Sequence, residues 1–131
     1  MPIIPKKILL VDDDKFLLDM YAIKFSKSGY EVKTADSTDG ALKLIKDGYT
    51  PDIILTDVVM PGMDGLEMVA KIQQEKLVPK AALIMLTNQG SSDDVGRARQ
   101  LNVDGYIVKA TTVPSDVLKS VENILITKKP V

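Results

Sequence analysis

Five short apolar segments alternate along the chain with five longer segments in which apolar residues recur at helical spacing. Four of the five apolar segments consist almost entirely of Ile, Leu, Val and Ala, which is typical of parallel strands covered on both faces. The segment Glu31–Ala35 is more polar, which is typical of an edge strand. We therefore predict strands over Lys7–Val11, Glu31–Ala35, Asp52–Leu55, Ala81–Leu86 and Gly105–Val108.

The longer segments have the apolar spacing of amphipathic helices. The first helix is expected from about Lys15 to Ser28, and Gly29 follows it as a helix-ending residue. The fourth has few apolar residues and contains Gly96. The residues that indicate the other helices, through their apolar spacing or as expected first and last residues, are Ser37, Thr38, Ala41, Leu44, Ile45 and Gly48 for the second helix, Leu66, Val69 and Ala70 for the third, Ser91–Asp94 for the start of the fourth, and Pro114, Val117, Val121 and Ile124 for the fifth.

Strand–helix alternation at this spacing predicts an α/β fold with a five-stranded, doubly wound parallel sheet and helices on both faces. The 131 residues are enough for one domain, which we place over 1–131 with a core of about 6–126. The segment Thr127–Val131 loses the apolar period and is expected to be a tail or the start of a linker.

Composition excludes several kinds of chemistry. The chain has no Cys and no His, so disulfides, thiolate nucleophiles, His-ligated zinc and His relays are absent. The 17 basic and 18 acidic residues are well mixed, and we expect neither direct nucleic-acid binding nor membrane binding. No apolar run approaches the roughly 20 residues of a membrane span, and no secretory signal is present, which favours a cytoplasmic location.

Polar side chains of a particular kind stand where the predicted strands end. Asp12–Asp14 follow the first strand, Asp57 the third, Thr87 the fourth and Lys109 the fifth. The carboxyl ends of parallel strands lie at one edge of the sheet, where open α/β folds bind ligands. The sequence therefore predicts that carboxylates, a hydroxyl and an ammonium group meet at this edge.

Electrostatics indicates what such a cluster can bind. Carboxylates about 4 Å apart repel by roughly 4 kcal/mol per pair at an effective dielectric constant near 20. The compensating charges are Lys109 and a hard divalent cation, for which oxygen ligands favour Mg²⁺. This combination suits phosphoryl transfer, in which one carboxylate can act as the nucleophile and form an acyl phosphate.

The most informative features are the segments Ile8–Asp13 and Asp52–Gly65, together with Thr87, Tyr106 and Lys109. Together they resemble the response-regulator receiver domain of two-component signalling, over about residues 6–126. The part from Asp57 to Gly65 is the most specific. The resemblance implies a flavodoxin-like sheet with strand order 2-1-3-4-5, similar to chemotaxis regulators.

The resemblance also implies a role for each acidic residue. Asp57 is the expected phosphoacceptor. Asp13, Asp57 and the backbone carbonyl of Val59 are expected to bind Mg²⁺ directly, and Asp12 is expected to act through water. The protein is then a phosphoprotein that catalyses only its own phosphorylation and dephosphorylation.

The same resemblance implies a switch and partners. Lys109 and Thr87 are expected to bind phosphoryl oxygens, and Tyr106 to change rotamer as Thr87 shifts. A histidine kinase or phosphotransfer protein is the expected phosphodonor. The downstream partner, a separate protein or an output domain, is not specified by the residues, and the chain is expected to be a monomer or a phosphorylation-dependent dimer.

Some acidic residues have a simpler structural explanation. We expect Asp14 and Asp64 to cap the helices that follow them. We also weigh two other functions for the chain. One is a receiver-like scaffold that is never phosphorylated. The other is a phosphatase of the haloacid-dehalogenase type, suggested by Asp12-x-Asp14, although Lys15 and Phe16 depart from that pattern.

Three positions depart from the receiver pattern. Ala110 follows Lys109 where the family usually has proline, so we expect a trans peptide with a rearranged loop or a strained cis bond. Asn88 replaces a small residue after Thr87 and is expected to narrow access to the phosphoryl group. Val59 has no polar side-chain group, so we expect that it cannot position an attacking water.

Overall fold

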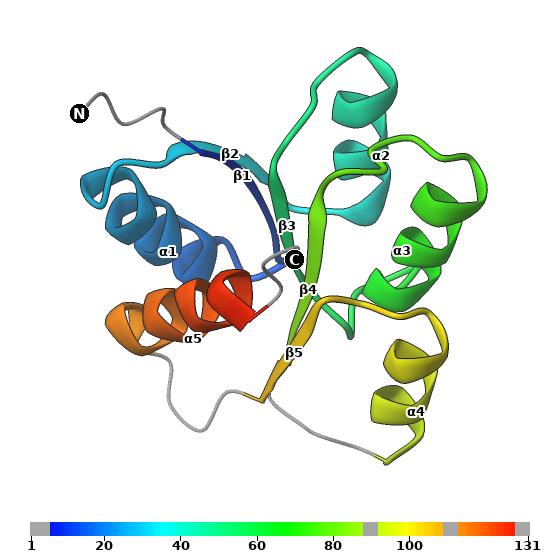
Figure 1. Ribbon diagram of the computed structural model, residues 1–131. Coiled ribbons are helices and arrows are strands. Elements are labelled where there is room, and N and C mark those ends of the chain that lie inside the picture. Colours follow the sequence, from blue (N-terminus) through cyan, green and yellow to red (C-terminus); the bar gives the residue numbers. More distant parts are fainter. Residues whose placement is uncertain (1–5, 88–91, 109–112, 128–131) are drawn as a thin grey trace.

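Helices and strands alternate regularly along the chain (Figure 1). The structure is a computed structural model that describes residues 6–87, 92–108 and 113–127. Within these residues the elements are β1 (Lys7–Val11), α1 (Lys15–Lys27), β2 (Glu31–Ala35), α2 (Thr38–Lys46), β3 (Ile53–Asp57), α3 (Gly65–Gln74), β4 (Ala82–Thr87), α4 (Ser92–Gln100), β5 (Gly105–Val108) and α5 (Pro114–Thr127).

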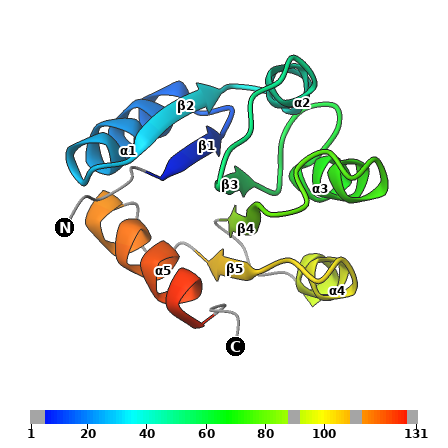
Figure 2. The same cartoon turned by 45° about the horizontal axis from the view of Figure 1, so that its top comes forward.

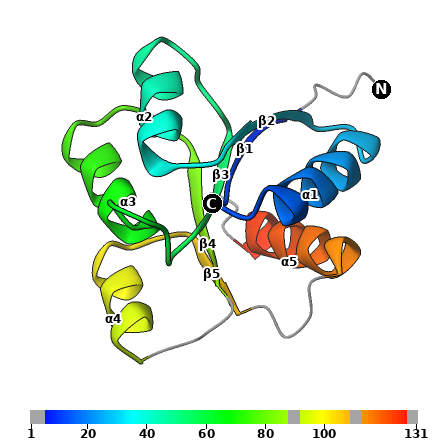
Figure 3. The same cartoon turned by 180° about the vertical axis from the view of Figure 1, so that it is seen from behind.

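The strands form one parallel sheet in the order β2-β1-β3-β4-β5, which confirms the expected order. Helices α1 and α5 cover one face, and α2, α3 and α4 cover the other (Figures 2 and 3). The more polar strand β2 lies at an edge, as its composition indicates. The fold is therefore the predicted doubly wound sheet.

Alternating residues of each strand supply two separate cores. On β1, Ile8 and Leu10 pack with the residues of α1 and α5, whereas Leu9 and Val11 pack with those of α2 and α3. These side chains are buried almost completely. Since burial of one such aliphatic side chain contributes about 1.5–3 kcal/mol, the two cores fix the helices firmly on their faces.

Two strands end later than the apolar pattern predicts. β3 continues through Thr56 to Asp57 rather than ending at Leu55, and β4 includes Thr87. The reason is the parallel ladder, in which Thr56 pairs with Val11 on one side and with β4 on the other. Backbone pairing does not depend on an apolar side chain, so it carries the polar residues to the end of the sheet.

Short polar side chains begin the helices. The Asp14 carboxylate accepts hydrogen bonds from the backbone N–H groups of Phe16 (3.0 Å) and Leu17 (3.2 Å), so Asp14 caps α1 as expected. Ser37 caps α2, whereas the neighbouring Thr38 is the first helical residue and donates its hydroxyl to the Met63 carbonyl at 2.8 Å. None of the helices within the described ranges has the length and apolar character needed to cross a membrane.

Candidate functional site

The acidic residues meet at the carboxyl edge of the sheet. Val11 on β1 pairs with Thr56 on β3, so the residues that follow them, Asp12 and Asp57, stand at the same level of the sheet. Asp12, Asp13 and Asp57 each offer a carboxylate oxygen, and these oxygens lie within 4.8 Å of one another. The predicted convergence of carboxylates is therefore present.

The three aspartates of this group differ in burial. Asp12 is buried, Asp57 is half-buried and Asp13 is exposed, so the cluster opens to solvent on one side. At separations near 5 Å the carboxylates repel by roughly 3–4 kcal/mol per pair at an effective dielectric constant of 20. A cation that enters from the open side can offset this repulsion.

Backbone hydrogen bonds orient two of the three carboxylates. The Asp12 Oδ1 atom accepts a hydrogen bond from the Asp14 backbone N–H at 2.9 Å. The Asp57 Oδ1 atom accepts one from the Val58 backbone N–H at 2.7 Å. Bonds this short hold each carboxylate in one orientation, and the site therefore needs little rearrangement to bind a cation.

The donor set fits Mg²⁺. All three groups are carboxylates, and the solvent-facing side leaves room for the waters that Mg²⁺ retains. Val59 lies two residues after Asp57 and is 67% exposed. Its side chain is a hydrocarbon, so the group it can offer to a cation is its backbone carbonyl. Among the described residues, the group formed by Asp12, Asp13 and Asp57 is the cluster of potential metal ligands.

Thr87 lies on the strand beside Asp57. It is the last residue of β4, it is buried, and the residue before it, Leu86, pairs with Asp57. The hydroxyl group therefore comes from a position one residue beyond the level of Asp57 on the neighbouring strand. The expected contact of Thr87 with a phosphoryl oxygen on Asp57 stays a prediction.

Tyr106 lies on β5 opposite Met85 and packs against the core on the α2–α4 face. Its hydroxyl is buried and has no hydrogen-bond partner among the described residues. Burial, followed by the negative charges of Asp94 and Asp57, raises the pKa of the Tyr106 phenol. The hydroxyl end of the ring is thus buried, and the expected movement of Tyr106 with Thr87 stays a prediction.

Three of the sequence predictions fall outside the described residues. Lys109 follows Val108, the last residue of β5, but it lies outside those ranges, as do Asn88 and Ala110. The predictions for the Lys109 ammonium, for the peptide bond before Ala110 and for access past Asn88 stay predictions.

Sequence reasoning missed two residues that support Asp57. Thr56 is fully buried, and its hydroxyl donates a hydrogen bond to the backbone carbonyl of Asp57 at 3.0 Å. Gly65, at the start of α3, lies so close to the same carbonyl that a Cβ atom would overlap with it. In the sequence, Asp64 indicates only a helix cap, and Gly65 holds no signal for this contact.

Tyr21 is a third residue whose position sequence reasoning did not anticipate. It lies among the apolar residues of α1 and is almost fully buried. Burial, with the charges of Asp12, Asp57 and Asp14, raises the pKa of its phenol to about 12. The hydroxyl is therefore buried and lies within the electrostatic influence of these carboxylates.

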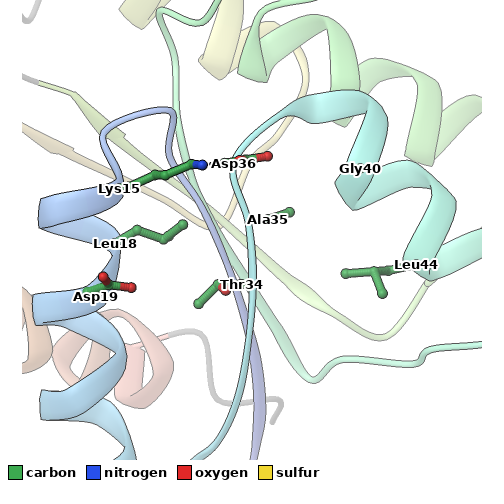
Figure 4. Close-up of a pocket in the computed structure, with 8 residues that line it drawn as sticks. All are labelled: Lys15, Leu18, Asp19, Thr34, Ala35, Asp36, Gly40 and Leu44. Carbon is green, nitrogen blue, oxygen red and sulfur yellow. Dashed lines mark ion pairs between the residues drawn. The ribbon is translucent and has the colours of Figure 1, made fainter.

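An open pocket of about 470 Å³ lies between α1, β2 and α2 (Figure 4). Lys15 and Asp36 point toward one another at this pocket, with 3.6 Å between Nζ and Oδ2. Both side chains are exposed, so the ion pair contributes little to stability.

Comparison with known families and structures gives one consistent result. The family model described as "Response regulator receiver domain" matches residues 8–122. The chain is similar in structure to the chemotaxis response regulator CheY4 of Vibrio cholerae, with a TM-score of 0.83, 28% identity, and coverage of 92% of this chain and 99% of that one. A CheY-like receiver domain protein from Methanospirillum hungatei has a TM-score of 0.83 and 31% identity, covering 95% and 96% of the two chains.

Longer regulators are also similar in sequence. The phosphate regulon transcriptional regulatory protein PhoB of Pseudomonas aeruginosa is 35% identical over 104 residues, which cover 79% of this chain and 45% of PhoB. The alkaline phosphatase synthesis transcriptional regulatory protein PhoP of Bacillus subtilis is 34% identical over 120 residues, covering 92% and 48%. This chain therefore spans about half the length of these curated relatives.

Proposed function

Because this chain belongs to the response regulator receiver domain family, we propose that Asp57 accepts a phosphoryl group in a Mg²⁺-dependent reaction. Members of the family are signalling phosphoacceptors of two-component systems rather than enzymes that turn over an external substrate, and they generally bind Mg²⁺ in an acidic pocket. The observation that supports the proposal best is the approach of the Asp12, Asp13 and Asp57 oxygens to within 4.8 Å of one another.

The proposed reaction needs a nucleophile and charge compensation. A carboxylate oxygen of Asp57 attacks the phosphorus of the donor, a new P–O bond forms, and the P–N bond to the donor histidine breaks. Mg²⁺, held directly by Asp13, Asp57 and the carbonyl of Val59 and through water by Asp12, would offset negative charge on the carboxylates and the phosphoryl oxygens. The orientation of Asp57 by the Val58 N–H places the nucleophile before the donor arrives.

Thr87, Lys109 and Tyr106 form the proposed switch. In the phosphorylated protein, the Thr87 hydroxyl donates a hydrogen bond to one phosphoryl oxygen and Lys109 pairs with another. Phosphorylation adds about −1.5 to −2 charges and three acceptor oxygens, so these groups favour the loop arrangement that binds it best. Tyr106 then changes rotamer with Thr87, and the surface of α4, β5 and α5 changes its affinity for a partner.

The proposed phosphodonor is a histidine kinase or a phosphotransfer protein. Phe16 and Val59, which follow the site aspartates closely in the chain, are 73% and 67% exposed. Apolar side chains exposed beside a reactive carboxylate suit contact with a protein surface better than contact with a small donor. The downstream partner is a separate protein or an output domain, and the chain acts as a monomer or as a dimer formed on phosphorylation.

The proposal is tested by incubation with acetyl phosphate and Mg²⁺, followed by intact-mass measurement. The wild type should gain one phosphoryl group, Asp57→Asn should gain none, and omission of Mg²⁺ should slow the reaction strongly. Asp36→Asn, which changes an exposed acid outside the three-carboxylate cluster, is the matched control and should react like the wild type.

Two other results would contradict the proposal. A wild type that stays unmodified would favour a scaffold that binds partners without phosphorylation. Turnover of a phosphate monoester that is lost in Asp12→Asn but kept in Asp57→Asn would favour a phosphatase of the haloacid-dehalogenase type.

A further inference from the structure

An ion pair connects α4 to the beginning of α3. The Arg97 guanidinium donates from Nη1 to Asp64 Oδ2 at 3.1 Å and from Nη2 to Asp64 Oδ1 at 3.3 Å. Arg97 also lies 3.5 Å from Asp94, one turn earlier on its own helix. The pair with Asp64 is bidentate and only partly exposed, with 42% and 24% of the two side chains exposed. Pairs with this geometry are among the stronger surface interactions because both partners are fixed in one orientation.

Asp64 is itself held in place before Arg97 binds it. It is the N-cap of α3, where its Oδ1 atom accepts a hydrogen bond from the Glu67 N–H at 2.8 Å. The Glu67 carboxylate accepts one in return from the Asp64 N–H at 3.2 Å, which completes a capping box. Arg97 therefore meets a carboxylate that has already lost its rotational freedom, so the pair costs less entropy than most surface pairs.

The residue after Asp64 is in contact with the phosphorylation site. The Gly65 N–H donates to the Val58 carbonyl at 2.9 Å, and Gly65 lies against the carbonyl of Asp57. The loop from Val58 to Asp64, which contains the proposed Mg²⁺ ligand Val59, is thus fixed at one end by β3. It is fixed at the other end by the cap of α3 and, through Asp64, by Arg97 of α4.

We propose that Arg97 is a positioning residue for the phosphorylation site, because its two bonds to Asp64 hold the Val58–Asp64 loop in the form that binds the cation and phosphoryl group. This inference rests on the proposed function. Since coupling is reciprocal, cation binding at the site also biases the position of α4. The pair thus joins the reaction centre to a helix of the proposed partner-binding surface.

A second contact between α3 and α4 makes the idea testable without loss of the fold. Gln73 donates from Nε2 to the Leu101 carbonyl at 2.6 Å, near the other ends of these helices. The apolar contacts of Ala98 with the core also remain when Arg97 is changed. Arg97→Ala is therefore expected to keep α4 on the sheet and to release only its link to the loop.

The experiment measures Mg²⁺ binding by backbone amide NMR in the wild type, Arg97→Ala, Arg97→Lys, Asp64→Asn and the double variant Asp64→Asn/Arg97→Ala. Asn caps helices about as well as Asp, so Asp64→Asn weakens the ion pair without removing the cap. Arg99→Ala is the matched control, because Arg99 is an exposed arginine on the same helix with no ion pair among the described residues.

We expect Arg97→Ala and Asp64→Asn each to raise the Mg²⁺ Kd by about fivefold, the size of effect that a well-ordered surface ion pair of about 1 kcal/mol produces. The double variant should show no further increase, because both changes break one interaction. Arg97→Lys, which keeps the charge but not the paired bonds, should give an intermediate Kd. Mg²⁺ should also shift the α4 amides in the wild type and Arg99→Ala, and this response should be lost in Arg97→Ala.

The inference is overturned if Arg97→Ala and Arg99→Ala have the same Mg²⁺ Kd, if the effects of the two single variants add fully, or if the α4 amides respond to Mg²⁺ without Arg97. A wild type that gains no phosphoryl group from acetyl phosphate contradicts the proposed function instead. The two failures are therefore distinguishable, because Mg²⁺ binding and its effect on α4 are measured without any phosphodonor.

Discussion

Gly65 at the start of α3 lies directly against the backbone carbonyl of Asp57 at the end of β3. Its N–H also donates to the carbonyl of the next residue, Val58, at 2.9 Å. The first turn of α3 is therefore packed onto the backbone that holds the proposed phosphoacceptor. Gly65 can lie this close to the Asp57 carbonyl because it has no side chain. A substitution of Gly65 therefore tests how strictly the position of Asp57 depends on this contact.

We predict that Gly65→Ala lowers the free energy of unfolding by about 1–3 kcal/mol, the usual cost of forcing an extra carbon into a packed site. It should also slow phosphorylation, since α3 and Asp57 must move apart. Gly96→Ala is the control: Gly96 lies inside α4 with open space around its Cβ position, so alanine there should stabilise by about 0.5–1 kcal/mol. Urea unfolding checks both values, and a Gly65→Ala protein as stable as the wild type would contradict the tight contact.

The carboxylate cluster predicts opposite effects of charge removal with and without Mg²⁺. Asp13→Asn removes repulsion from Asp12 and Asp57, so it should raise the free energy of unfolding in EDTA by about 1 kcal/mol. This value is smaller than the full Coulomb repulsion, because Asp13 is exposed and solvent screens its charge. In the wild type, Mg²⁺ at tenfold its Kd should add about 1.4 kcal/mol, and Asp13→Asn should lose most of this gain. Thermal unfolding measures both.

Asp19→Asn is the control for that experiment, because Asp19 is an exposed acid on α1 outside the cluster. It should keep the full stabilisation by Mg²⁺. Equal stabilisation of the wild type and Asp13→Asn by Mg²⁺ would show that the cation binds elsewhere.

The buried phenol of Tyr21 predicts a loss of stability at alkaline pH. Its pKa is raised from 10.0 to about 12 in the folded protein, first by burial and then by Asp12, Asp57 and Asp14. The folded state thus binds this proton more tightly than the unfolded state does. The resulting stability is complete below about pH 10 and is lost as the pH rises toward 12.

Tyr21→Phe removes this contribution, so the stability of the variant should fall less steeply than that of the wild type between pH 10 and 12. Urea unfolding at several pH values compares the two proteins, and phenolate absorbance reports the titration directly. A Tyr21-dependent absorbance change centred near pH 10 in the folded protein would be evidence against the buried position of the hydroxyl.

Because the side chain of Val59 is apolar, we predict slow loss of the phosphoryl group from Asp57. Its side chain is 67% exposed, two residues after Asp57, and offers no group that can orient a water. Val59→Asn supplies a polar amide at this position and should speed dephosphorylation roughly tenfold, below the 10²–10⁴ of a complete general base. Ile23→Asn, a change of an exposed apolar residue on α1, is the control. Intact-mass measurement over time follows the loss of the phosphoryl group from the wild type, Val59→Asn and Ile23→Asn. Equal decay rates in all three proteins would rule out this role of Val59.

Much of the site is readable from local patterns. The apolar runs place five strands in the chain, and the polar residues that follow them, such as Asp12 and Thr87, are then expected at one edge of a parallel sheet. The same patterns misplace the ends of β3 and β4, because Thr56 and Asp57 continue the backbone ladder after the apolar run stops. Periodicity reports which side chains are buried, whereas the ends of a strand depend on what its neighbours can still pair with.

The links between segments could not be read in this way. Arg97 and Asp64 are 33 positions apart, and nothing in the residues around either one indicates its partner. The helical spacing around Tyr21 indicates only that its side chain is buried, and it holds no information about Asp12, Asp14 and Asp57, whose charges act on its phenol.

The sequence by itself determined the order of elements, the parallel sheet and the kinds of groups at its carboxyl edge, because hydrophobic spacing and strand-end residues are local properties of the chain. Only the tertiary structure decided the separation of the carboxylates, the gradient from buried Asp12 to exposed Asp13, and the contact of Gly65 with Asp57. Such distances arise from the register of the strands and the packing of helices on the sheet, which depend on the shapes of many side chains at once.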